Sequence, residues 1–146
     1  MKRMLVCLDG SPRERGVLDA AMALGKKSGA KLVLFRSVGI PADLPPEAYA
    51  ISPTEVPGLL EGRARRDLEK LVEALPAELR GGVHTTVGSP WRSIEAVATE
   101  EDVDLIVIGS HGYEAADRLL GTTAAKVVNH SDRSVLVVRS PERLAR

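Results

Sequence analysis

Glycine and threonine residues with the spacing of an anion site follow an apolar run in the last third of the chain. They are Gly109, Gly112, Gly121, Thr122 and Thr123. The run at residues 105–108 reads as a buried strand, and a helical pattern opens after the third glycine. A helix N-terminus presents unpaired N–H groups and a partial positive charge, and glycine lets the backbone approach a ligand closely. We therefore expect residues 104–123 to hold the phosphates of a nucleotide.

Five apolar runs alternate with four helical patterns and must position this segment. The expected strands cover residues 4–8, 31–38, 83–87, 105–108 and 134–138. The first helix is expected to begin with a capping box, in which Ser11 is the cap, Pro12 opens the helix and Glu14 lies three residues after the cap. Ser89 and Pro90 repeat this start before the third helix. The alternation predicts an α/β fold with an open, five-stranded, mostly parallel sheet and helices on both faces.

The stretch between the second and third strands divides into a loop and a helix. Residues 39–57 are rich in proline and are expected to form a loop that serves as a lid, as a partner surface or as a tolerated insertion. Apolar residues then recur on one stripe from residue 59 to residue 75, which predicts a surface helix closed by Pro76 and the Gly81-Gly82 pair. Trp91, in the first turn of the third helix, fits a packing or partner contact better than ligand stacking.

This topology predicts where a ligand binds. In open α/β sheets the ligand lies outside the carboxyl ends of the strands, at the point where the strand order reverses. Asp9 and Gly109 both sit at strand ends, so they face each other if the first and fourth strands are neighbours. A carboxylate at the position of Asp9 accepts a hydrogen bond from a sugar hydroxyl or an exocyclic amine, helps to hold a metal beside phosphate, or only caps its own turn.

Composition argues against several classes of partner. The 20 basic and 20 acidic residues give a formal net charge of zero, so no overall attraction to nucleic acid or anionic membrane is expected. The single Cys7 cannot form an internal disulfide, no apolar run approaches the length of a membrane span, and no signal peptide is expected. We expect a cytoplasmic protein with one domain, residues 1–140, and a polar tail, residues 141–146.

Other chemistries lack the residues that they need. A P-loop requires a glycine, four residues and then Gly-Lys-Ser/Thr, and a dinucleotide fold requires G-x-G-x-x-G after the first strand; neither motif is present. A phosphoacceptor domain requires clustered acids beside Asp9 and a lysine after the last strand, where this chain has Arg139. Cys7 has no evident base partner, and the histidines do not stand at a metal-ligand spacing from it.

Five segments, in this order, resemble the universal stress protein family. They are LVCLDGS at residues 5–11, GSP at 88–90, DLIVIGSHG at 104–112, GT at 121–122 and SVLVV at 134–138. The resemblance covers essentially the whole chain. It implies a five-stranded α/β sheet, a homodimer paired through the last strand, Ser134–Val138, and in one subclass an ATP site. That subclass carries glycine, two residues, glycine, nine residues, and then glycine with serine or threonine.

The resemblance also implies which residues bind the nucleotide. Asp9 would face the adenine or ribose end, and Ser37 would line the adenine pocket. The residues that would hold the ribose and phosphates are Gly109, Gly112, Gly121, Thr122 and Thr123. His111 reads either as a phosphate contact or as an exposed loop histidine. The chain departs from the family pattern at three points: eight residues instead of nine precede Gly121, Cys7 stands where proline is common, and Arg36 stands where histidine is usual.

Two functions are compatible with these features. The first is a nucleotide-binding regulatory protein of the stress response, with ATP in the glycine loop and Mg²⁺ bridging the phosphates. Hydrolysis would be slow at most, because no general base or arginine finger is identifiable. The second is a ligand-free dimeric interaction module in which the same loop is a structural turn and the proline-rich segment or Trp91 meets a partner protein. The discriminating feature is the length of the glycine loop.

Overall fold

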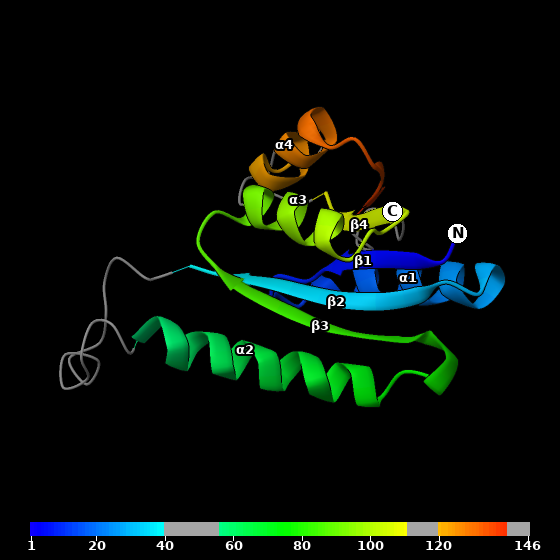
Figure 1. Cartoon of the computed structure of the whole chain (residues 1–146), viewed down its shortest axis with the longest axis horizontal. Helices are drawn as coiled ribbons and strands as arrows, with labels where there is room; N and C mark the ends of the chain where they lie inside the picture. The colour runs from blue at the N-terminus through cyan, green and yellow to red at the C-terminus, as the bar shows by residue number, and fades with distance from the viewer. Residues whose placement is uncertain (40–55, 111–119, 140–146) are drawn as a thin grey trace.

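The computed structural model describes residues 1–39, 56–110 and 120–139, and these form one sheet with helices on both of its faces (Figure 1). The strands are β1 (Arg3–Cys7), β2 (Lys31–Val38), β3 (Arg80–Val87), β4 (Leu105–Gly109) and β5 (Ser134–Val138). The helices are α1 (Glu14–Ser28), α2 (Val56–Glu73), α3 (Pro90–Glu100) and α4 (Thr122–His130), with a short 3-10 helix, η2 (Ala77–Leu79). The predicted α/β class is therefore confirmed.

The strands lie in the order β3-β2-β1-β4-β5, and every pairing between them is parallel. The sheet is thus parallel throughout, where the sequence predicts a mostly parallel one. β1 and β4 are neighbours, with Leu5 opposite Ile106, as the placement of the site requires. β3 and β5 form the two edges of the sheet.

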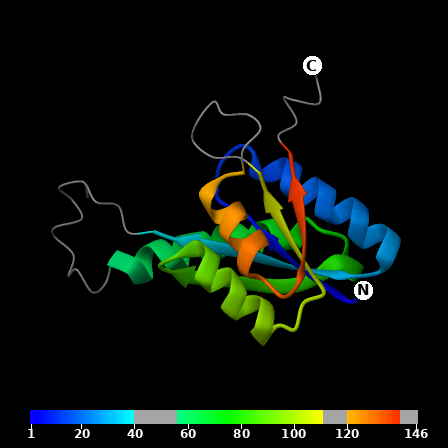
Figure 2. The ribbon, with the colours of Figure 1, turned by 90° about the horizontal axis from the view of Figure 1, so that it is seen from above.

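Side-chain alternation along the strands builds two cores, one on each face of the sheet. On β1, Met4 and Val6 pack with α1 and α2, whereas Leu5 packs with α3 and α4. Successive side chains of a strand point to opposite faces, so a central strand must be apolar at every position. Figure 2 shows α1 and α4 on opposite sides of β4 and β5.

The capping box predicted for α1 is not formed. The helix begins at Glu14 rather than at Pro12, and Ser11 accepts a hydrogen bond from the N–H of Arg13 at 3.2 Å. The carboxylate of Glu14 instead accepts the N–H of Gly10 at 2.8 Å and pairs with Arg36 of β2. Because Arg36, which is distant in the sequence, pairs with the Glu14 carboxylate, this carboxylate does not take the position that the capping box predicts.

Gly81 and Gly82 do not close α2, as the sequence suggested; they belong to β3. A Cβ atom on Gly81 would lie 2.8 Å from the carbonyl oxygen of Leu32, and Gly82 has φ +103°. The β2–β3 register shifts between Leu32 and Leu34 at this point. The glycines therefore allow a bulge at the sheet edge, a role that glycine often has inside strands. At its other end α2 begins at Val56, two residues inside the segment predicted to be loop.

A cluster of hydrogen bonds aligns the first residues of the two central strands. The carboxylate of Asp104 accepts the N–H of Lys2 at 2.6 Å and that of Arg3 at 3.0 Å, while its own N–H donates to the carbonyl of Arg3 at 2.9 Å. These bonds thus fix the register of β1 and β4 at the amino-terminal ends of the two strands. In the described part of the chain no helix combines the length and the apolar character needed to cross a membrane.

Candidate functional site

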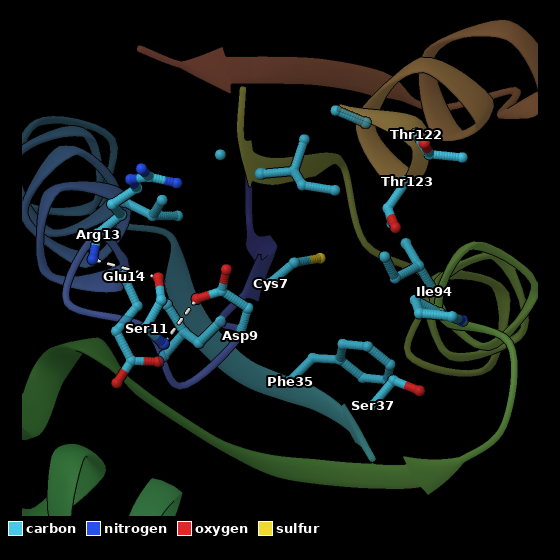
Figure 3. Close-up of a pocket in the computed structure, with 16 residues that line it drawn as sticks. Cys7, Asp9, Ser11, Arg13, Glu14, Phe35, Ser37, Ile94, Thr122 and Thr123 are labelled. Carbon is cyan, nitrogen blue, oxygen red and sulfur yellow. Dashed lines mark hydrogen bonds between the residues drawn. The ribbon is translucent and has the colours of Figure 1, made fainter. Parts of the chain in front are cut away.

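A cavity of about 460 Å³ opens at the carboxyl ends of β1, β2 and β4 (Figure 3). The sheet runs from β1 to β3 in one direction and from β4 to β5 in the other, so the cavity lies where the strand order reverses. The N-terminal ends of α1, α3 and α4 contribute the rest of the described lining. Small-molecule pockets typically measure roughly 300–1,000 Å³, and the cavity is within that range.

The turn after β1 brings Asp9 to the cavity wall. Its Oδ1 accepts the N–H of Ser11 at 2.9 Å, so the turn-capping role considered for this residue is present in the structure (Figure 3). Gly10 has φ +80°, a conformation that a side chain would strain, and the turn therefore depends on glycine at this position. Asp9 is exposed and lines the cavity while it caps the turn.

An ion pair between α1 and β2 anchors this turn. Arg36 Nη2 lies 3.0 Å from Glu14 Oε2, the same oxygen that accepts the Gly10 N–H. The side chains of Arg36 and Glu14 are only 12% and 21% exposed, so water screens the pair incompletely. Arg36 also approaches Asp67 of α2 at 3.5 Å. The Asp9 turn is thus connected through Glu14 and Arg36 to α2.

The start of α4 forms the opposite wall. The N–H of Gly121 donates to the carbonyl of Ser110 at 2.9 Å, and the N–H of Ser110 donates to the carbonyl of Val138 in β5 at 2.9 Å. These bonds hold the first turn of α4 against the end of β4. Thr122 and Thr123 follow at the helix N-terminus and line the cavity together with Gly109. Unpaired N–H groups and a partial positive charge are features of such a terminus.

One end of the cavity is apolar. Cys7, Phe35, Ile94 and Ile108 line it, and the Cys7 side chain points toward Thr123 and Ile94 (Figure 3). Burial, and secondarily the charge of Glu95, raises the pKa of the Cys7 thiol well above its ordinary value. The thiol is therefore neutral at physiological pH and acts as a small apolar surface. Ser37 borders this end, and its hydroxyl donates to the carbonyl of Gly88 at 3.1 Å.

Trp91 stacks on His130 with 4.9 Å between ring centroids and an interplanar angle of 29°. It is partly buried against the core of the α3–α4 face and is not part of the described cavity lining. Arg92 and Lys126 approach the same ring at 5.4 and 6.0 Å. The contact joins α3 to α4, which agrees with the packing role expected from the sequence.

The structure brings together most of the residues expected at the site. Asp9, Ser37, Gly109, Thr122 and Thr123 line the cavity, and Gly121 immediately precedes the last two. Two further candidates, His111 and Gly112, lie outside the described residues.

Several lining residues were not assigned to the site by the sequence analysis, among them Arg13, Glu14, Phe35 and Ile94. A signal for the first two was present, because they follow the Asp9 turn directly and must lie at the carboxyl edge of the sheet. Phe35 and Ile94 were identifiable only as apolar residues of a strand and a helix, a description that fits most core positions.

The lining fits a nucleotide better than a metal bound by protein alone. Within residues 1–39, 56–110 and 120–139, no group of three or more His, Cys, Asp or Glu side chains is arranged to hold a metal ion. Mg²⁺ is commonly held by one or two carboxylates together with substrate phosphates. Asp9 is a carboxylate of this kind, and the threonines at the start of α4 suit phosphate oxygens.

A parallel sheet with a cavity at its switch point defines the class of open, parallel α/β folds. Within this class, the universal stress protein family model matches residues 1–139. The chain belongs to the universal stress protein family. It is 28% identical to the universal stress protein Sll1388 from Synechocystis, with 94% of this chain and 97% of the relative covered.

Solved structures share the fold. The universal stress protein UspA from Lactobacillus plantarum matches with a TM-score of 0.75 and 23% identity, covering 94% of this chain and 97% of the other. A universal stress protein in complex with cAMP matches at 0.62 and 24%, covering 94% and 96%. The Archaeoglobus fulgidus protein in complex with dAMP matches at 0.57 and 20%, covering 94% and 98%.

Proposed function

We propose that this protein is an ATP-binding regulatory protein of the stress response. The observation that carries the proposal is the cavity between β1 and β4, which has an apolar end at Phe35 and Ile94 and a helix N-terminus at Thr122. A nucleotide has the matching asymmetry, because its base is flat and largely apolar and its phosphates are anionic. The base would occupy the apolar end, and the phosphates would lie toward α4.

The remaining lining residues have roles consistent with this orientation. Asp9 is an acceptor for a ribose hydroxyl or for the exocyclic amine of adenine, and it is also a carboxylate ligand for Mg²⁺ that accompanies the phosphates. Ser37 borders the base, where its oxygen accepts a hydrogen bond while its hydroxyl donates to Gly88. Gly109 lets a sugar or phosphate approach the end of β4 closely.

The same geometry supports slow hydrolysis at most. Glu14 lines the cavity, but its carboxylate is held by Arg36 and by the N–H of Gly10. The raised pKa of the Cys7 thiol keeps it protonated, and a protonated thiol is a poor nucleophile. Binding, rather than turnover, is thus the expected activity, and we propose a regulatory role in the cytoplasm.

Two structural relatives were solved with adenine nucleotides, one with cAMP and one with dAMP. They support adenine nucleotides as the ligand class for this fold. They do not specify the number of phosphates, so ATP is proposed from the lining of this cavity.

A thermal-shift titration with ATP and Mg²⁺ tests the proposal. A ligand that binds only the native state at a concentration of about 100 times its Kd stabilises that state by about 2.7 kcal/mol. In a chain of this size such a gain raises Tm by roughly 5 to 10 °C. An unchanged Tm at millimolar ATP would contradict ATP binding.

A dimeric interaction module is the second candidate, and the exposed residues around β5 favour it. Leu136 on β5 is 37% exposed and Val128 on α4 is 43% exposed, and β5 is an edge strand. Open strand edges with apolar side chains tend to pair with another chain. We propose a homodimer paired through Ser134–Val138, which is compatible with either function.

A further inference from the structure

Three arginines surround the Asp9 turn, and they differ in what they contact. Arg36 pairs with Glu14 at 3.0 Å and approaches Asp67 at 3.5 Å. Arg15 pairs with Asp19 one helical turn later, at 3.2 Å, and is not among the residues that line the cavity. Arg13 lines the cavity, and within the described residues its guanidinium makes no ion pair.

The position of Arg13 is fixed by its backbone. Its N–H donates to Ser11 Oγ at 3.2 Å, and it directly precedes the first residue of α1. Figure 3 shows its side chain on the α1 side of the cavity and Thr122 and Thr123 on the opposite, α4 side. An anionic chain that starts at α4 and spans the cavity would therefore end near this guanidinium.

The charged side chains of the described lining single out Arg13 as the candidate phosphate contact. Among the described lining residues the charged side chains are Asp9, Arg13 and Glu14. Glu14 is paired with Arg36, so part of its negative charge is offset. Arg13 is the one lining cation in the described part of the chain, and its planar guanidinium suits two phosphate oxygens at once.

We propose that Arg13 contacts the outer phosphates of the bound nucleotide and makes the cavity prefer nucleoside di- and triphosphates over the unphosphorylated nucleoside. The inference rests on the proposed nucleotide site. It adds a phosphate contact just before α1 to the one expected at the N-terminus of α4. Arg13 is a specificity-determining residue in this scheme. The nucleoside portion is recognised elsewhere, at the apolar end and at Asp9.

The test compares Arg13→Gln, Arg15→Gln and the unaltered protein. Each is titrated by calorimetry with adenosine, AMP, ADP and ATP in the presence of Mg²⁺, after circular dichroism has verified the fold. Arg15→Gln is the matched control, because it removes the same charge two residues along the chain, at a residue that is not part of the described cavity lining. The readout is the ratio of the ATP affinity to the adenosine affinity.

A charge-assisted hydrogen bond at a partly exposed site predicts that this ratio falls about tenfold in Arg13→Gln and stays within about twofold in Arg15→Gln. The ratio should also fall with added salt in the unaltered protein, and less steeply in Arg13→Gln. Arg13→Lys keeps the charge and should retain part of the preference.

The outcomes separate this inference from the proposed function. If the unaltered protein binds the nucleotides but Arg13→Gln keeps the same ratio, the Arg13 inference fails and the nucleotide site stands. An equal loss in Arg13→Gln and Arg15→Gln would also overturn it, because general electrostatic attraction then explains the preference. If the unaltered protein binds none of the ligands at millimolar concentration, both proposals fail.

Discussion

Gly121 and Ser110 are joined by a 2.9 Å hydrogen bond from the N–H of the glycine to the carbonyl of the serine. The bond connects the start of α4 to the end of β4 across residues 111–119. The phosphate end of the proposed site is consequently fixed by backbone atoms. Thr122 and Gly109 line the same cavity.

Gly121→Val should abolish the ATP-dependent rise in Tm. Gly121 is buried and has φ −61° and ψ 161°, a conformation open to any residue, so the fold should persist. A branched side chain would, however, occupy the space in which phosphate approaches α4. Gly58→Val is the control, because a Cβ atom there meets no other atom within 4 Å. An ATP shift of normal size in Gly121→Val would refute the assigned phosphate site.

The rate of Cys7 alkylation gives a second, independent test of ligand binding. Because its pKa is raised, iodoacetamide should alkylate it at least about tenfold more slowly in the native protein than in the urea-unfolded protein at neutral pH. Saturating ATP should slow the reaction further, since the base would cover the thiol. Mass spectrometry can follow the modification without ambiguity, because the chain has a single cysteine. An unchanged rate with bound ATP would mean that the base does not lie beside Cys7.

Arg36→Met should lower the free energy of unfolding by about 2 kcal/mol, because it leaves the poorly exposed carboxylate of Glu14 without its cation. Asp67→Asn removes the other, longer contact of Arg36. Asp67 is 53% exposed, so its loss should cost about 0.5 kcal/mol or less. Urea unfolding of both variants measures the difference. Equal losses would show that Glu14 is not the important partner.

Asp104→Ala should destabilise the protein in a pH-dependent manner. Hydrogen bonds from the N–H groups of Lys2 and Arg3 lower the pKa of Asp104 in the folded protein. A lowered folded-state pKa gives stability that is present above the pKa of the unfolded chain, about 4, and is lost as pH falls through the folded-state value. The difference in unfolding free energy between the two proteins should therefore be constant from about pH 6 to 8 and shrink below about pH 4. A difference that is the same at acidic and neutral pH would contradict this linkage.

Leu136→Glu should convert the proposed dimer to monomer. The substitution places a charge on the edge strand that would be buried at a β5 interface. Leu59→Glu is the control, because Leu59 is 55% exposed on α2, which packs against β2 and β3 at the other edge of the sheet. Sedimentation equilibrium gives the masses. A monomeric unaltered protein, or a Leu136→Glu variant that remains dimeric, would contradict pairing through β5.

Local sequence features predicted the strands and the starts of α3 and α4 well. The apolar run 31–38 is buried on both faces from Leu32 to Phe35, and Pro90 at the first position of α3 fixes the helical backbone angle. These features depend on residues that are close together in the sequence, so they can be recognised from the sequence alone. That β1 and β4 are neighbours was left as a condition by the sequence, and the strand pairing meets it.

The errors have a common physical origin in contacts between distant residues. Glu14 has the spacing of a capping box, yet Arg36, 22 residues away, determines where its carboxylate lies. Gly81 reads as a turn residue, and only the nearby carbonyl of Leu32 explains why it is glycine within a strand. Arg13 was overlooked for the same reason, since an arginine at a helix start is ordinary until the cavity beside it is known.

The central position of β1 also determines when the cavity can exist during synthesis. The described lining runs from Cys7 to Ala124, so a nascent chain lacks part of the binding site until residue 124 has been made. β1, α1 and β2 can pair early, but the inner edge of β1 must wait for β4, whose first residue is Leu105. Such non-local pairing slows folding and leaves an apolar edge exposed in the meantime. A ligand of this cavity can therefore bind only after β4 has paired with β1, and it stabilises only chains whose sheet is already assembled.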